Sequence, residues 1–237
     1  LFAYRDEGDR ESWTMSRSAA GASGSRWLPI RKPELYAGDV FQTLCRARGL
    51  VLPAPEVTQT LPQGAEVAGI DSKPLVEILR GMLKFSINLT AELVGLHASG
   101  APDLATSARR MQAWLVAQGQ GLDFHLADHS GLSPDSRVTA RGMARLLAGP
   151  GLAAGLPGIL KQNPLNEDLG DDPGSAVQVA AKTGTLNFVS GLAGYANAGN
   201  EYIFAVFCAD LSRRRAAVGE ERPAGGAQWT RGARVLQ

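Results

Sequence analysis

The segment from Val177 to Cys208 constrains the fold of this chain more than any other part. It contains three apolar runs, VQVAAKTGT, SGLAGY and YIFAVFC, separated by turns at Leu186-Asn187 and at Asn197 to Asn200. Short runs rich in β-branched, aromatic and small residues, bounded by glycine and asparagine, are typical of successive antiparallel strands. The sequence therefore predicts an antiparallel meander close to the end of the chain.

The first of these strands carries Lys182-Thr183-Gly184, a tripeptide with a defined chemistry. Lys182 would place a cation, and Thr183 a hydroxyl, beside a substrate carboxylate or a serine whose proton must move. Gly184 has no side chain, so another backbone can approach the strand closely. An edge strand of this kind can also pair with an extended peptide. The tripeptide is short and occurs by chance, so a functional assignment requires a partner motif.

The partner motif is Ser86-Ile87-Asn88, which lies 96 residues before Lys182. The stretch before it, Asp71 to Phe85, has apolar residues at helical spacing, and a second amphipathic stretch, Leu89 to His97, follows it. The sequence thus predicts that Ser86 and Asn88 lie at a junction between two helices, where short polar side chains can face a cleft.

A third segment, Asp128 to Ser133 (DHSGLS), completes an ordered set of motifs. The series K-x-S-x-N, L-x-A-E-L, D-x-S-G-L-S, K-T-G-T and G-L-A-G-Y-A resembles the D-alanyl-D-alanine carboxypeptidase/endopeptidase family, the low-molecular-mass class C penicillin-binding proteins. The resemblance covers the chain from about Trp27 to its C-terminus. It implies an α/β (α+β) fold of the penicillin-binding transpeptidase and β-lactamase type, with an antiparallel sheet flanked by helices and a helical subdomain.

The same resemblance implies serine acyl transfer on the D-Ala-D-Ala end of peptidoglycan stem peptides, and acylation by β-lactam inhibitors. Three residues are the expected catalytic groups. Ser86 would relay a proton to the leaving amine with help from Lys182. Asn88 would hydrogen-bond the amide carbonyl of the substrate and help to hold the lysine of the nucleophile's motif.

The expected substrate-binding residues are Thr183, Gly184 and Thr185. Thr183, with the neighbouring lysine, would bind the terminal carboxylate, and the backbone N–H of Thr185 would form half of the oxyanion hole. Asp128 and Ser130 are expected to lie close to the active site and to support it. Asp128 in particular is suited to fixing its loop through Asx-type hydrogen bonds.

The nucleophile of the family lies in a Ser-x-x-Lys motif, and no serine of this chain has a lysine three residues later. We therefore expect the nucleophile upstream of Leu1, in an exported, periplasmic protein whose signal peptide is not in this chain. On this interpretation the chain alone does not form an acyl-enzyme. Two alternatives stay open: a homologue that binds peptidoglycan without cleaving it, and a β-lactamase-like hydrolase, which D-x-S-G-L-S disfavours.

The composition limits the partners. The net charge of +1 gives no indication of nucleic-acid binding, and no apolar run approaches the length of a membrane span, about 20 residues. No cofactor is expected. His125 and His129 are four residues apart, but nearby glycines disfavour a helix and no third ligand is evident, so no metal site is expected. Cys45 and Cys208 are expected to be free thiols, with a disulfide between them as the alternative.

Two regions are expected. Residues 1–26, charged and then rich in Ser, Gly and Ala, are interpreted as a flexible linker or the tail of an inserted domain, and residues 27–237 as the C-terminal part of the catalytic domain. Ser72 and Thr139 are candidate N-caps. Short strands are predicted at Leu50–Leu52 and Glu66–Ile70, and a polar loop at Arg213–Gly226. The further predicted helices are Glu34–Arg48, Asp103–Gln118, Arg137–Leu147 and Gln228–Gln237.

Overall fold

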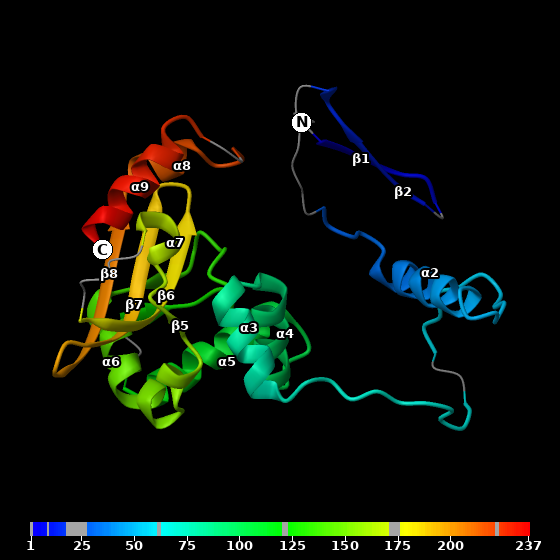
Figure 1. Ribbon diagram of the computed structural model, residues 1–237, viewed down its shortest axis with the longest axis horizontal. Helices are drawn as coiled ribbons and strands as arrows, with labels where there is room; N and C mark the ends of the chain where they lie inside the picture. The colour runs from blue at the N-terminus through cyan, green and yellow to red at the C-terminus, as the bar shows by residue number, and fades with distance from the viewer. Residues whose placement is uncertain are drawn as a thin grey trace. The chain divides into compact units, whose positions relative to one another are not determined.

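The computed structural model describes residues 2–8, 10–17, 28–60, 63–119, 123–170, 176–220 and 223–237. It divides into two compact units, Leu1–Ile70 and Asp71–Gln237 (Figure 1). The boundary that the sequence suggested between residues 26 and 27 lies outside the described residues, as does most of the Ser/Gly/Ala-rich stretch. The domain assignment therefore stays a prediction.

The first unit begins with a β-hairpin, where the sequence suggested a flexible segment. Strands β1 (Phe2–Asp6) and β2 (Glu11–Met15) pair antiparallel, with Tyr4 opposite Trp13. The two rings contact each other at 5.1 Å between centroids. The flexible-linker alternative was wrong for this part, because cross-strand aromatic pairs stabilise a hairpin even when charged residues surround them. The other alternative, the tail of an inserted domain, stays a prediction.

Helix α2 (Pro33–Arg46) follows in the same unit and ends before Gly49, whose φ of 84° suits a glycine. The two short strands predicted after it are absent from the structure. Val67 and Ile70 are 97% and 99% exposed, and neither segment pairs with a strand in the described part of the chain. Extended apolar residues form a strand only when a neighbouring strand satisfies their backbone groups.

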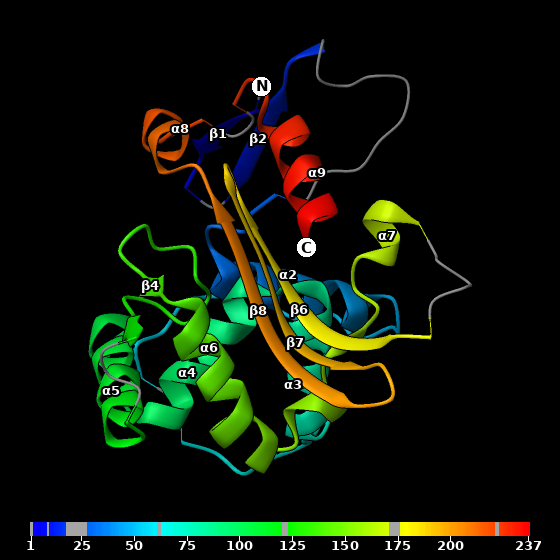
Figure 2. The ribbon, with the colours of Figure 1, turned by 90° about the vertical axis from the view of Figure 1, so that its left-hand side faces the viewer.

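The second unit is built on a four-stranded antiparallel sheet, in the order β5-β6-β7-β8 (Figure 2). The strands are β5 (Lys161–Gln162), β6 (Gln178–Leu186), β7 (Val189–Asn197) and β8 (Glu201–Ala209). Because Leu186 pairs with Val189, the first turn consists of Asn187 and Phe188, and Phe188 has a positive φ of 58°. The meander predicted from the sequence is confirmed.

The two faces of this sheet contact different helices. On one face Ala181 is fully buried and pairs with Gly194 of β7. A Cβ added to Gly194 would lie only 2.6 Å from the Ala181 Cβ, so the close packing requires a glycine. Helix α9 (Gly226–Leu236) packs on this face through β7. On the other face lies α6 (Ala140–Leu146), and the Tyr195 hydroxyl donates to the Leu147 carbonyl at 2.9 Å. The two helices flank the long strands in Figure 2.

A group of helices precedes the sheet: α3 (Leu75–Phe85), α4 (Asn88–Ser99) and α5 (Leu104–Ala117). Ser72 was the wrong N-cap for α3, which begins directly after Pro74. Thr139 is confirmed as the N-cap of α6, since its hydroxyl accepts from the Gly142 N–H at 2.9 Å. The remaining elements are β3 (Phe124–His125), β4 (Arg137–Val138), a π-helical turn (Leu147–Gly151), a 3-10 turn (Leu156–Gly158), α7 (Asn166–Leu169) and α8 (Leu211–Ala216).

Two of these elements correct the sequence-based expectations. Arg137, expected to begin a helix, lies in β4, which pairs with β3. Helix α8 occupies part of the expected loop from Arg213, because Asp210 caps it by accepting from the Arg213 N–H at 3.0 Å. The expected fold class, an antiparallel sheet flanked by helices with a helical part beside it, is confirmed.

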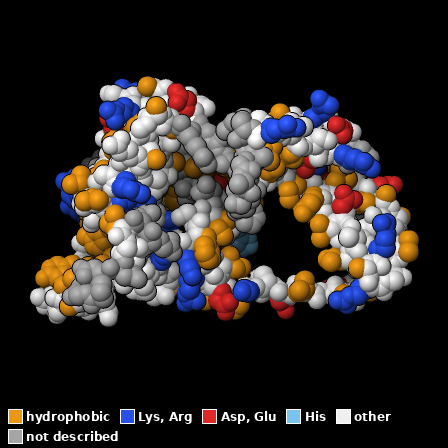
Figure 3. Space-filling view, turned by 45° about the horizontal axis from the view of Figure 1, so that its top comes forward, with side chains coloured by type: hydrophobic (Ala, Val, Ile, Leu, Met, Phe, Trp, Pro, Cys, Tyr) orange, Lys and Arg blue, Asp and Glu red, His pale blue; other side chains and the backbone are white. Residues whose placement is uncertain are grey.

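The surface carries many large apolar side chains, as the space-filling view shows (Figure 3). On α3, Leu75, Val76 and Phe85 are exposed, and on α2 so are Phe41 and Leu44. Among the described helices, none is both long enough and apolar enough to cross a lipid bilayer.

Candidate active site

The corner between α3 and α4 is built around an unusual backbone conformation. Ser86 ends α3 with φ 53° and ψ 52°, and the backbone N–H groups of Ser86 and Ile87 both donate to the Met82 carbonyl. Helix α4 then begins at Asn88. The left-handed region costs a non-glycine residue about 1–2 kcal/mol. Serine at this position provides an exposed hydroxyl at the corner between the helices. A glycine would avoid the strain but would not provide the hydroxyl.

Lys182 of β6 reaches this corner. Its Nζ donates to the Ser86 Oγ at 2.5 Å and also to the Thr183 carbonyl. The two short motifs, 96 residues apart in the sequence, therefore meet in space. A charge-assisted hydrogen bond between an ammonium group and a hydroxyl gives a direct route for a proton.

The surroundings of Lys182 lower the pKa of its side chain. Burial of the side chain is the largest cause of its lowered pKa, and the positive charges of Arg234 and Lys161 lower the pKa further. A lysine whose pKa moves from its ordinary value towards neutrality exchanges protons more readily at physiological pH.

The strand that carries Lys182 presents a free edge. The short strand β5 pairs only with Ala180 and Ala181, so in the described sheet the residues from Lys182 to Leu186 have a neighbour on the β7 side alone. Gly184 and Thr185 are exposed, and a Cβ built on Gly184 meets no atom within 4 Å. Unpaired N–H and C=O groups along such an edge can bind an extended peptide as an additional strand.

Asn88 is not brought into the Ser86–Lys182 contact. It is the first residue of α4 and is exposed, and the described part of the chain contains no hydrogen bond from its side chain to either residue. Its position, two residues after Ser86, places it at the same corner. Its predicted role stays a prediction.

The loop that contains Asp128 and Ser130 is fixed by internal hydrogen bonds. The carboxylate of Asp128 accepts from the Ser133 N–H at 2.7 Å, the Ser136 hydroxyl at 2.7 Å and the Ser130 hydroxyl at 3.2 Å. Burial alone would raise the pKa of Asp128, but these hydrogen bonds outweigh it and the pKa is lowered. Asp128 is therefore an ionised anchor of the loop.

Glu92, the glutamate of the L-x-A-E-L segment, attaches this loop to α4, a role that the sequence analysis did not predict. Its carboxylate accepts from the backbone N–H groups of His129, at 3.2 Å, and Ser130, at 2.9 Å. Glu92 lies one helical turn after Asn88, so the loop lies along the face of α4 that begins at Asn88. The sequence places Glu92 in the L-x-A-E-L segment, but a single sequence does not show which backbone groups its carboxylate binds.

The ring of His129 packs against α4 at Gly95, which has no side chain. Its ring lies so close to Gly95 that a Cβ on this glycine would be 2.2 Å from Nδ1, and its Nε2 is 2.7 Å from the hydroxyl of the fully buried Ser107. His125 lies in β3, so the two histidines do not share a helix face. Among the described residues, no group of three or more His, Cys, Asp or Glu is suited to holding a metal ion.

Comparison with known proteins identifies the family of this chain. A family model described as the D-Ala-D-Ala carboxypeptidase 3 (S13) family matches residues 15–232. The chain belongs to this family. The family expected from the ordered motifs is thus confirmed.

Two carboxypeptidases are related to this S13-family chain. Carboxypeptidase Rv3627c of Mycobacterium tuberculosis is 34% identical over 214 residues, with 80% of this chain and 45% of the relative covered. Carboxypeptidase DacB of Mycolicibacterium smegmatis is 32% identical over 193 residues, with 69% and 40% covered. This chain therefore spans less than half the length of these relatives.

A solved structure supports the fold. The Bd0816 predatory endopeptidase from Bdellovibrio bacteriovorus, in complex with immunity protein Bd3460, is similar with a TM-score of 0.53. The identity is 16%, and the match covers 86% of this chain and 54% of that one. At this identity the similarity shows the fold alone.

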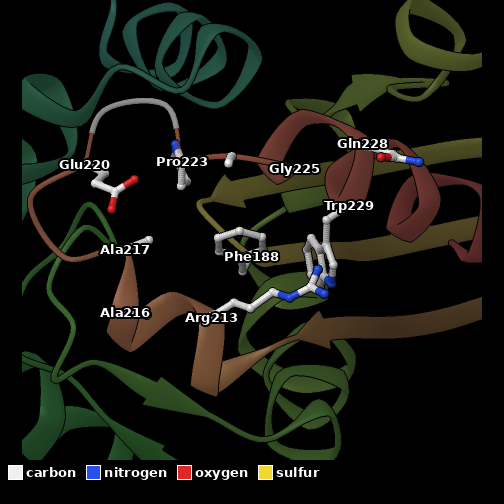
Figure 4. A pocket seen from close by; sticks show the side chains of 10 residues that line it. Phe188, Arg213, Ala216, Ala217, Glu220, Pro223, Gly225, Gln228 and Trp229 are labelled. Atoms are coloured by element: carbon white, nitrogen blue, oxygen red, sulfur yellow. The ribbon is translucent and has the colours of Figure 1, made fainter.

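The S13-family chain also has a cavity of about 740 Å³ at the turn between β6 and β7, bordered by α8 and α9 (Figure 4). Phe188 and Trp229 meet there edge to face at 6.1 Å, and the Arg213 guanidinium lies 5.8 Å from the Phe188 ring. Neither Ser86 nor Lys182 lines it. This cavity is therefore separate from the corner that the motifs form.

Arg234, which the sequence analysis did not identify, lies beside β6, the strand that carries the Lys-Thr-Gly motif. The Nη2 atom of Arg234, on α9, donates to the Thr185 Oγ1 at 2.5 Å, and Arg234 is only 6% exposed. In the sequence, an arginine in a C-terminal amphipathic stretch cannot be distinguished from an arginine on the surface.

Cys45 and Cys208 are free thiols in different units.

Proposed function

We propose that the full-length protein is a serine-type D-Ala-D-Ala carboxypeptidase acting on peptidoglycan stem peptides through an acyl-enzyme. The observation that carries this proposal is the 2.5 Å hydrogen bond between Lys182 and Ser86 beside the free edge of β6. It joins a proton-transferring pair to a strand edge that an extended peptide can occupy.

In the proposed reaction, a serine supplied by another part of the protein attacks the carbonyl between the two D-alanines. The serine oxygen bonds to the carbonyl carbon while its proton passes to a base, and the negative charge on the carbonyl oxygen is stabilised by two backbone N–H groups. The N–H of Thr185 is one of these donors and the N–H of the nucleophile is the other. Removing such a donor typically costs about 3–4 kcal/mol of transition-state stabilisation.

The C–N bond then breaks and the departing D-alanine amine takes up a proton. Ser86 would deliver it; the hydrogen bond from Lys182 to its hydroxyl supports this role, since Lys182 can restore the proton. Thr183 and Lys182 bind the terminal carboxylate, and Asn88 binds the substrate amide. Water hydrolyses the acyl-enzyme and releases the shortened peptide.

β-Lactams would acylate the same serine. Since peptidoglycan lies outside the cytoplasmic membrane, we place the protein in the periplasm after export. Asp128 and Ser130 would act by holding their loop against α4, next to Asn88.

The test uses the full-length protein and two readouts, release of D-alanine from a stem peptide and labelling by a fluorescent penicillin. Ser86→Ala and Lys182→Ala should each lower the labelling rate at least tenfold, which is about 1.4 kcal/mol of barrier. Lys84→Ala is the matched control, because Lys84 is an exposed lysine in the last turn of α3.

Unchanged labelling in Lys182→Ala would contradict the assigned role of this residue. If the wild type binds the stem peptide but neither releases D-alanine nor reacts with penicillin, the protein is a binding module instead. If penicillin is turned over rapidly and the peptide is not, it is a β-lactamase-like hydrolase.

A further inference from the structure

Arg234 makes a contact that its place in the sequence does not suggest. Its side chain extends from α9 to the sheet face opposite the Ser86 corner, since alternate residues of a strand point to opposite faces. Its Nη2 donates to the Thr185 Oγ1 at 2.5 Å, and its Nη1 lies 3.5 Å from the Gln237 Oε1. A buried guanidinium therefore lies directly behind the residue that follows the Lys-Thr-Gly motif.

The direction of this hydrogen bond has a chemical consequence. A guanidinium group is only a donor, so the Thr185 oxygen must be the acceptor. The proton of the Thr185 hydroxyl then cannot point towards Arg234. Because Thr185 is exposed at the free edge of β6, its O–H is available to an acceptor on the substrate side.

We propose that Arg234 is a positioning residue that orients the Thr185 hydroxyl to donate to the terminal carboxylate of the substrate. This inference rests on the function proposed above and adds to it a residue that does not itself touch the substrate. A hydroxyl whose oxygen already accepts from a cation is a stronger donor than a freely rotating one. The site therefore selects a substrate end that carries a carboxylate.

The charges around the strand agree with this arrangement. Lys182 points towards Ser86 on one face and Arg234 reaches Thr185 on the other, so the edge between them lies in a positive potential. The positive charge of Arg234 also contributes, after burial, to the lowered pKa of Lys182. An anion bound at this edge would be attracted by both.

The experiment compares two acylating probes that differ in the carboxylate alone. Benzylpenicillin carries the carboxylate, and its methyl ester keeps the β-lactam ring without the charge. In the full-length protein, Arg234→Gln should lower the acylation rate by benzylpenicillin about tenfold and change the rate with the ester by less than twofold. Arg231→Gln is the matched control, because Arg231 is an exposed arginine of the same helix and should leave both rates unchanged.

A double-mutant cycle with Thr185→Val tests whether Arg234 acts through the hydroxyl. Thr185→Val should lower the benzylpenicillin rate about tenfold, Thr185→Ser should retain it, and adding Arg234→Gln to Thr185→Val should have less than a twofold further effect. If Arg234→Gln does not fold, Arg234→Lys takes its place in the same cycle, since it retains the charge but not the planar donor group.

Three results would overturn the proposal. Arg234→Gln could leave the benzylpenicillin rate within twofold, it could lower the rates with acid and ester by the same factor, or its effect could persist undiminished in Thr185→Val. The second result would mean that Arg234 only holds α9 against the sheet. If the wild type reacts with neither probe and releases no D-alanine, the proposed function itself fails, and this is seen before any variant is compared.

Discussion

Replacing Ser86 by glycine should separate the stability of the α3–α4 corner from its chemistry. Ser86 has a left-handed backbone conformation, with φ 53°. Relative to alanine at this position, glycine avoids a strain of about 1–2 kcal/mol, but loses about 0.5–1 kcal/mol through its greater freedom in the unfolded chain. The hydrogen bond to Lys182 is lost in both variants, so it cancels in the comparison.

We therefore expect Ser86→Gly to be more stable than Ser86→Ala by about 1 kcal/mol, which corresponds to about 2–4 °C in Tm for a domain of roughly 150–250 residues. Both variants should be labelled by penicillin at least tenfold more slowly than the wild type, because neither has the hydroxyl. Thermal unfolding and the labelling rate are measured on the same preparations of the full-length protein.

The matched control is the same pair of substitutions at Ser72, an exposed serine outside the left-handed region. There the glycine variant should be no more stable than the alanine variant. If Ser86→Gly is likewise no more stable than Ser86→Ala, the corner is not strained and the structural argument is refuted. If Ser86→Gly keeps the wild-type labelling rate, the hydroxyl has no part in acylation.

Two further predictions concern the surroundings of the site. Lys161→Gln removes a positive charge that lowers the pKa of Lys182, so this pKa should rise and the alkaline limb of the penicillin acylation profile should move to higher pH; a limb that stays in place or moves down contradicts the assignment. Gly95→Ala should lower the free energy of unfolding by about 2 kcal/mol or more, because the new Cβ would overlap the His129 ring. The control Gly81→Ala, in an open position of α3, should instead be neutral or stabilising by up to about 1 kcal/mol in denaturant unfolding, and equal effects of the two substitutions would exclude the clash.

The strands β6 to β8 and most helices could be predicted from the sequence because their signals are local. Turn residues and alternating small and branched side chains mark the meander, and Thr139 follows the rule for an N-cap. The same rules failed where a long-range partner decides the outcome. The hairpin of β1 and β2 depends on the pairing of Tyr4 with Trp13, and the predicted strand at Glu66–Ile70 has no partner.

For the candidate site, the sequence supplied the motifs, their order and the family that they indicate. The residues that support the motifs were not predictable in the same way. Glu92 belongs to the L-x-A-E-L segment and Arg234 to a C-terminal helix, but the sequence does not show their partners. Folding places Glu92 against the Asp128 loop and Arg234 behind Thr185.

The sequence by itself determined the meander, the Ser-x-Asn and Lys-Thr-Gly motifs and membership of the S13 family, since these depend on residue type and spacing along the chain. Only the tertiary structure decided that Lys182 meets the Ser86 hydroxyl, that Ser86 is held in a strained conformation and that a buried arginine faces Thr185. The reason is that a contact between residues 96 positions apart depends on how helices pack against a sheet edge, and no local pattern encodes that packing.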